Sequence, residues 1–301
     1  MNKLINVRNI RKQIDKDLNK FILDTESRYR GQLFTLANKI LAKNNVKIVL
    51  LAGPSCAGKT TTAKLLKQIL EIKGRAVDVI SMDDFFIDLD KRKPLPNGKP
   101  DFDSPEILDY ELMESCFSRY FAGEDVYFPE YDFKNSKSIP NKNLHKYKFN
   151  TIIIFEGIHV LNPRLLKSLG TSNYFKLYVS PLKSFKTDNK VMSTKNLRLL
   201  RRVIRDIQRR NTPAEKTIQM WPEVTAVEEQ YIEPYRTKVD YYVDTTQEYE
   251  LGVYKGEVER FVADGKIKPE EVPFYDIVEQ VDEISKDLIP DTSLMWEFVD
   301  K

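Results

Sequence analysis

The chain has 301 residues, of which 41% are hydrophobic and 31% charged, and its formal net charge is only +3. This composition predicts a folded α/β chain with ample core and argues against a disordered chain or a strongly basic nucleic-acid-binding protein. Two cysteines, Cys56 and Cys116, are too few for a disulfide framework or a zinc site. The polar first residues and the lack of a long apolar run favour a cytoplasmic protein.

The first 45 residues form an N-terminal extension that carries two helical repeats of apolar residues. The first repeat runs from Ile10 to Ile22 and the second from Leu33 to Leu41. We expect two amphipathic helices that cover a core, in preference to a surface that binds a partner helix.

Residues 53–60 read Gly-Pro-Ser-Cys-Ala-Gly-Lys-Thr and match the pattern G-x-x-x-x-G-K-[ST] in full. An apolar segment over 46–52 predicts a buried strand before them, and an apolar stripe over 61–72 predicts a helix after them. Glycines let successive N–H groups point inward, and the helix N-terminus adds positive potential. The loop therefore predicts nucleoside triphosphate binding, with a chance glycine-rich turn as the alternative. The expected nucleotide-binding residues are Gly53, Ser55, Cys56, Ala57, Gly58, Lys59, Thr60 and Thr61.

Strand patterns alternate with helical stretches through a core that we place at residues 46–245. This alternation predicts a P-loop NTPase-type parallel sheet with helices on both faces. Short strand patterns at 126–133 and 145–149 predict an antiparallel flap over that sheet, and residues 246–301 predict a C-terminal helical extension packed on the core. The strand patterns lie at residues 46–52, 76–81, 151–155, 174–179 and 239–243.

Acidic residues follow two of the predicted strands. Asp83 comes shortly after strand 76–81, and Glu156 ends strand 151–155. Ligands of open α/β sheets lie beyond the carboxyl ends of the strands, so we expect both carboxylates near the terminal phosphate. One would accept a proton from an attacking hydroxyl and the other would hold Mg²⁺, whereas a simple helix-capping role is the alternative.

A helix predicted over 197–210 is rich in arginine. Its guanidinium groups would repel one another unless an anion joined them, because Asp206 is the only carboxylate in this segment. We expect this helix to be part of a lid over the triphosphate, at about residues 181–213. A solvated basic face and an RNA-contacting helix are the alternatives. The arginines are Arg198, Arg201, Arg202, Arg205, Arg209 and Arg210.

Six segments in register give the chain a wider resemblance. They read GPSCAGKTTTAKLL, SMDDFF, FDSPEILDYEL, VYFPEYDF, IIIFEGIHVLNP and RLLRRVIRDIQRRNTPAEKTIQMW. Over about residues 46–245 the chain resembles the uridine kinase and phosphoribulokinase family. Its ending resembles a bacterial branch in which such a kinase follows a TGS-type domain, and that domain is absent from these 301 residues.

The resemblance implies a kinase that uses ATP and Mg²⁺ to phosphorylate the 5′-hydroxyl of a nucleoside, with uridine or cytidine as first choices. It implies that Asp83 is the catalytic base, that Lys59 acts on the phosphates, and that Thr60 and Glu156 hold Mg²⁺. The remaining implied roles are contacts with ribose by Asp103, a base pocket formed by Phe86, Tyr131 and Phe133, and phosphate contacts by Arg198, Arg201 and Arg205.

The chain departs from this family where the acceptor would be recognised. Ser136 and Met220 stand where uridine kinases place a histidine and a glutamine, so polar groups that discriminate between bases are missing. A kinase for another small alcohol, such as a sugar phosphate or a pantothenate-like acceptor, is therefore a second hypothesis. A non-catalytic, nucleotide-dependent RNA-associated module is a third, although we expect no membrane partner and disfavour a nucleic-acid partner. A homo-oligomer is also compatible with the sequence.

Overall fold

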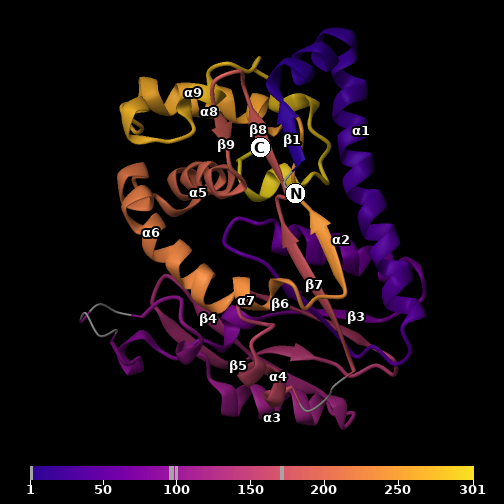
Figure 1. Cartoon of the computed structure of the whole chain (residues 1–301). Helices are drawn as coiled ribbons and strands as arrows, with labels where there is room; N and C mark the ends of the chain where they lie inside the picture. The colour runs from indigo at the N-terminus through magenta and orange to yellow at the C-terminus, as the bar shows by residue number, and fades with distance from the viewer. Residues whose placement is uncertain (1–2, 95–97, 99–100, 170–172) are drawn as a thin grey trace.

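The computed structural model describes residues 3–94, 98, 101–169 and 173–301. Within these residues, a five-stranded parallel sheet forms the centre of the fold (Figure 1). The predicted parallel sheet is confirmed, and each of its strands lies within two residues of the predicted bounds. In spatial order the strands are β10 (Tyr241–Asp244), β7 (Tyr174–Ser180), β2 (Ile48–Ala52), β6 (Ile152–Gly157) and β3 (Val77–Ser81).

Both faces of this sheet are covered, because its central strand is apolar on both sides. Ile48 and Leu50 pack into one apolar cluster, and Val49 and Leu51 pack into another. The Val49 cluster joins the sheet to α1 (Val7–Ala42), α2 (Lys59–Ile72), α5 (Thr194–Arg210), α6 (Ala214–Tyr231) and α8 (Glu250–Ala263). The Ile48 cluster joins it to α3 (Tyr110–Phe121) and α4 (Pro163–Ser168).

The N-terminal extension differs from the prediction. Strand β1 (Lys3–Asn6) precedes α1, which the non-helical residue Asp17 (φ −170°, ψ 95°) divides into two helical stretches. Two helices are therefore present as predicted, but the break lies inside the first apolar repeat and not between the two repeats. Strand β1 pairs in parallel with β8 (Lys183–Lys186), which also pairs with β9 (Val191–Met192). The two paired strands are separated by more than 170 residues of sequence, so no local sequence pattern predicts this pairing. Residues 1 and 2 of the predicted extension lie outside the described residues.

The antiparallel flap is present, but its second strand lies earlier than expected. Strand β4 (Val126–Asp132) pairs with β5 (Lys137–His145), which shares only His145 with the strand predicted at 145–149. A tight turn with Ser136 at φ +55° closes the hairpin directly after β4. Every β5 residue is exposed or only partly buried, so the strand lacks the apolar alternation by which sequence reasoning finds strands.

The C-terminal tail is less helical than the sequence suggests. After α8 the chain forms short turns and the single-turn helix α9 (Tyr275–Val278), and it ends in a short 3₁₀ turn at Leu294–Glu297. The tail still packs into the main core through Phe274, Met295 and Phe298. The short helix α7 (Glu233–Arg236) connects α6 to β10. No helix in the described ranges is long and apolar enough to cross a membrane.

Candidate active site

The glycine-rich loop connects the central strand β2 to α2 and is shaped by close contacts. A Cβ atom at Gly53 would lie 2.2 Å from the carbonyl oxygen of Val179 in β7, so no side chain fits there. Gly58 has φ +90°, which glycine adopts without strain. Thr245, which follows β10, donates a hydrogen bond of 2.7 Å to the carbonyl oxygen of Ala57. The curled conformation is thus fixed from outside the loop.

A cavity of about 410 Å³ lies against this loop. Lys59 lines it from the start of α2 and donates a hydrogen bond of 3.1 Å to the carbonyl oxygen of Pro54. The Thr60 side chain is exposed toward the same space. Of the residues expected to bind nucleotide, the structure brings Ser55, Cys56, Lys59 and Thr60 to the cavity, whereas Gly53, Ala57 and Gly58 shape the loop behind it.

The two predicted carboxylates meet at the carboxyl edge of the sheet. Strand pairing places Glu156 of β6 opposite Ser81 of β3, and Asp83 lies two residues after Ser81 in the next turn. Both carboxylates line the cavity. Asp83 is not the capping residue of that turn, because the Ser81 hydroxyl accepts the hydrogen bond from the Asp83 N–H. The structure therefore places Asp83 and Glu156 together beside Lys59, as the strand order demands.

Burial in this site shifts the acidity of both carboxyl groups. Burial raises the pKa of Glu156 to about 7, although the nearby Lys59 ammonium acts in the opposite direction. Burial likewise raises the pKa of Asp83, again opposed by Lys59. A carboxylate in this setting holds a proton more strongly than it would in water, which suits proton transfer near neutral pH.

Three arginines of α5 form a positive wall of the cavity. Arg202, Arg205 and Arg210 all line it, and all three surround the carboxylate of Asp206 at 3.5, 2.7 and 3.6 Å. Within this cluster of four side chains, one carboxylate is shared by three guanidinium groups, so the cluster itself is positively charged. Such a cluster favours a polyanionic ligand such as a triphosphate. Sequence reasoning included Arg202 and Arg210 in the arginine-rich helix but did not single them out as phosphate contacts, although the spacing 202, 206, 210 places them within reach of Asp206.

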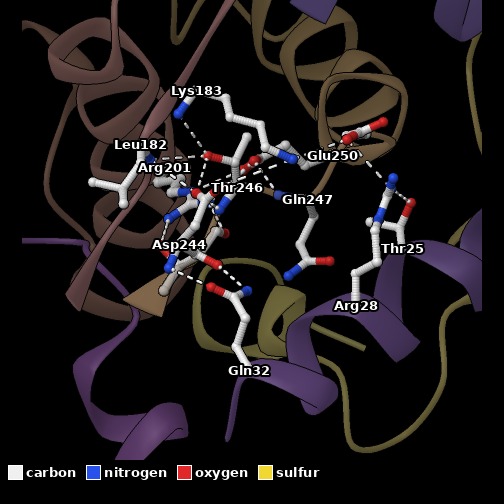
Figure 2. Close-up of polar contacts among 12 residues, drawn as sticks. Thr25, Arg28, Gln32, Leu182, Lys183, Arg201, Asp244, Thr246, Gln247 and Glu250 are labelled. Atoms are coloured by element: carbon white, nitrogen blue, oxygen red, sulfur yellow. Dashed lines mark hydrogen bonds and ion pairs between the residues drawn. The ribbon is translucent and has the colours of Figure 1, made fainter. Parts of the chain in front are cut away.

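Two other arginines of α5 do not reach the cavity, which corrects their predicted phosphate contacts. Arg201 has a fully buried side chain and forms an ion pair of 2.8 Å with the equally buried Glu250 (Figure 2). Arg198 binds both carboxylate oxygens of Glu228 at 2.7 Å. Each of these guanidinium groups is neutralised by its own carboxylate, so neither is available to a ligand without breaking that pair.

The lid predicted at residues 181–213 stays a prediction, and in this structure the segment is firmly packed. Strand β8 of this segment is paired with β1, and α5 is anchored to the core through Arg201. The segment is built into the fold and does not stand free of it. The solvated-face interpretation does not hold for Arg202 and Arg205, whose side chains are only 13% and 17% exposed, whereas the Arg210 side chain is 55% exposed.

The opposite side of the cavity is aromatic. Phe86 and Tyr131 meet edge to face at 5.5 Å, and Phe133 lies 5.1 Å from Tyr131. Arg92, which sequence reasoning missed, stacks on Phe86 and Tyr131 and donates a hydrogen bond of 2.7 Å to the Tyr131 hydroxyl. Ser136 and Met220, at the positions where the sequence departs from uridine kinases, also line this cavity.

Asp103 lies between the aromatic wall and the arginines. It lines the cavity, and burial raises its pKa while Arg202 acts against that rise. The buried His159 ring approaches the Asp103 carbonyl oxygen at 2.6 Å. Burial lowers the pKa of His159 to about 4, so the neutral ring donates this bond from Nε2, and Nδ1 has no hydrogen-bond partner among the described residues. His159 therefore has a structural role and fixes the backbone at Asp103.

The parallel sheet, the glycine-rich loop after its central strand and the two carboxylates at neighbouring strand ends define a class of protein: a P-loop phosphotransferase. Residues 48–251 match the phosphoribulokinase / uridine kinase family. The chain belongs to this family.

Individual relatives agree with this assignment. The chain is 29% identical over 207 residues to a uridine kinase of Mycoplasma genitalium, a match that covers 68% of this chain and 87% of that protein. It is 26% identical over 202 residues to the uridine kinase-like protein 5 of Arabidopsis thaliana, covering 67% of this chain and only 37% of that protein. A putative fructose transport system kinase from Silicibacter shares the fold, with a TM-score of 0.50 and 20% identity over 66% of this chain and 95% of that one.

Proposed function

We propose that this protein is an ATP- and Mg²⁺-dependent kinase that transfers the γ-phosphoryl group to the 5′-hydroxyl of a nucleoside, with uridine or cytidine as the first candidates. One observation carries the proposal. A single cavity contains the phosphate loop, two carboxylates at the strand ends, an arginine wall and an aromatic wall. These are the elements that phosphoryl transfer to a small alcohol requires.

Asp83 is the proposed base. Its carboxylate would accept the proton of the acceptor hydroxyl as the acceptor oxygen bonds to the γ-phosphorus and the bond to the β-phosphate oxygen breaks, releasing ADP. The raised pKa of Asp83 makes it a stronger base than an exposed aspartate, and Lys59 helps to keep it ionised. Arg202, Arg205 and Arg210 would stabilise the charge on the transferred group.

The donor set of the site fits Mg²⁺. In the described part of the chain, no three His, Cys, Asp or Glu side chains are grouped as a ready-made metal site. Mg²⁺ commonly binds through one or two carboxylates together with substrate phosphates, and Glu156, the Thr60 hydroxyl and Asp83 offer such hard oxygen ligands. When bound there, Mg²⁺ would neutralise phosphate charge.

The aromatic wall supports a planar base as the acceptor's recognition group, because Phe86, Tyr131 and Phe133 present ring faces and edges to the cavity. Arg92 on the same wall supports a second candidate, an alcohol that carries an acidic group, as a sugar phosphate or a pantothenate-like acceptor does. An ADP-release assay across all nucleosides and across such acidic alcohols separates the two. Release with neither class would contradict the kinase proposal.

Asp83→Asn tests the mechanism. We expect this variant to bind ATP as the wild type does and to lose about 10³-fold in kcat, because the base is removed while the phosphate site stays intact. The matched control is Asp84→Asn, since the adjacent Asp84 carboxylate accepts a hydrogen bond from the Tyr131 N–H and does not line the cavity. Its loss should be tenfold at most. Wild-type kcat in Asp83→Asn would show that another group is the base.

A further inference from the structure

The phosphate loop of this protein donates two of its N–H groups to carboxylates of the same chain. The Ser55 N–H donates to Glu228 at 3.1 Å, and the Thr61 N–H donates to Glu297 at 2.9 Å. Thr61 lies in the first turn of α2, whose N–H groups have no partner within the helix. At a P-loop, these are the donors that phosphate oxygens accept.

The negative charges of these two carboxylates differ in whether a nearby cation neutralises them. Glu228 is neutralised by the guanidinium group of Arg198, which binds both of its oxygens. Glu297 forms no ion pair with a lysine or an arginine in the part of the chain that the structure describes, and it lines the cavity. Its negative charge therefore faces the space in which the phosphates would lie. A phosphate and this carboxylate would repel each other and compete for one donor.

Glu297 is held in place by the rest of the C-terminal segment, residues 293–300, which we call the C-terminal cap. Leu294 packs so closely on the loop that a Cβ atom at Gly58 would lie 2.7 Å from its Cδ1 atom. The buried Phe298 ring lies 4.6 Å from the guanidinium carbon of Arg201. Arg209 of α5 donates hydrogen bonds of 2.8 to 3.0 Å to the carbonyl oxygens of Trp296, Glu297 and Val299.

We propose that Glu297 gates the nucleotide site: its carboxylate occupies the position of a nucleotide phosphate at the Thr61 N–H, and nucleotide binding displaces it. The inference rests on the proposed nucleotide binding and adds a regulatory contact from outside the range matched by the family, residues 48–251. Displacing Glu297 pulls on the backbone that Arg209 holds. Nucleotide entry is thereby coupled to loosening of the C-terminal cap.

The first test measures the dissociation constant of ATP by calorimetry, without acceptor, for the wild type, Glu297→Gln and Glu270→Gln. Glu270 is exposed on the surface, so its variant removes the same charge away from the site. We expect Glu297→Gln to bind ATP about tenfold more tightly and Glu270→Gln to match the wild type. Unchanged or weaker binding by Glu297→Gln would overturn the gate while leaving nucleotide binding intact. Absence of ATP binding in all three proteins would instead overturn the proposed function and the gate with it.

The second test follows the cap directly in the wild-type protein. Hydrogen–deuterium exchange of residues 293–300 should become several-fold faster when ATP saturates the site, because the contact between Glu297 and Thr61 is lost. Residues of α3, on the other side of the sheet, serve as the internal reference. Unchanged or slower exchange in the cap on ATP binding would overturn the gate.

Discussion

Helix α5 carries arginines into two settings that differ in how the charge is balanced. Toward α8 and β10, Arg201 meets Glu250 one to one, and both side chains are fully buried. Toward the cavity, Arg202, Arg205 and Arg210 share the single carboxylate of Asp206. The charges of Arg201 and Glu250 neutralise each other, whereas the three arginines around Asp206 carry more positive charge than Asp206 neutralises.

The difference shows which arginines are structural and which are available to a ligand. A charge that is removed from water needs a partner of opposite sign, because the cost of desolvation is otherwise several kcal/mol. Excess charge is tolerated only where solvent or a ligand reaches it. The number of carboxylates per guanidinium group, more than the number of arginines, therefore identifies the part of α5 that faces the phosphates.

The largest expected effect comes from removing one partner of the buried ion pair between Arg201 and Glu250. Arg201→Met should lower the free energy of unfolding by about 4 kcal/mol, because Glu250 is left buried and uncompensated. Combining it with Glu250→Leu should recover most of that loss, since no buried charge remains. Urea unfolding of both variants measures this. A loss below about 1 kcal/mol in the single variant would show that the pair does not anchor α5.

Removing one arginine from the cluster around Asp206 should lower activity strongly and stability only slightly. Arg205→Ala should lower kcat about 100-fold, because charge that stabilises the transferred group is lost. Stability should fall by only about 1 kcal/mol, since Arg202 and Arg210 still neutralise Asp206. Lys195→Ala, which removes a cation from the exposed side of the same helix, is the control in steady-state kinetics. An equal loss of kcat in both variants would contradict the assignment of Arg205.

The smallest effect concerns Glu156, a cavity carboxylate without an arginine of its own. Its pKa of about 7 in the fold lies above its ordinary value of 4.5, so the fold favours the protonated form. The resulting stabilisation is complete below about pH 4.5 and is lost as the pH rises through 7. Without nucleotide or Mg²⁺, the wild type should therefore lose on the order of 2 kcal/mol between pH 5 and 8 from this group.

Glu156→Gln should lack this contribution to the pH dependence. The measurement is the urea midpoint of the wild type and the variant at pH 5 and at pH 8, with Glu270→Gln as a surface control. Identical pH dependence in the wild type and Glu156→Gln would show that Glu156 is ionised in the folded protein across this range.

Much of the site could be predicted because its residues lie in short, continuous sequence motifs. The glycine-rich loop lies between a strand and a helix, and Asp83 and Glu156 lie at the carboxyl ends of their strands, which pair side by side in the sheet. The aromatic residues and Asp103 came from the family resemblance, and the structure also places them at the cavity.

Other parts could not be predicted from local patterns. Strand β5 buries neither of its faces, and β1 pairs with β8 from the far part of the chain. The helical repeat of α5 shows that its arginines lie on different faces, yet it does not reveal which face meets Glu250. Glu297 lies in a tail whose sequence resembles a bacterial branch of the family but does not indicate a contact with the phosphate loop, and only folding brings it to Thr61.

The sequence by itself determined the class of chemistry, because a phosphate loop and carboxylates at the ends of predicted strands are encoded by short-range periodicity and spacing. Only the tertiary structure decided which charges remain available and which are neutralised. Ion pairing depends on distances of a few ångströms between residues that are far apart along the chain. That is why Arg201 became part of the core, and why Arg202, Arg205 and Arg210 line the cavity.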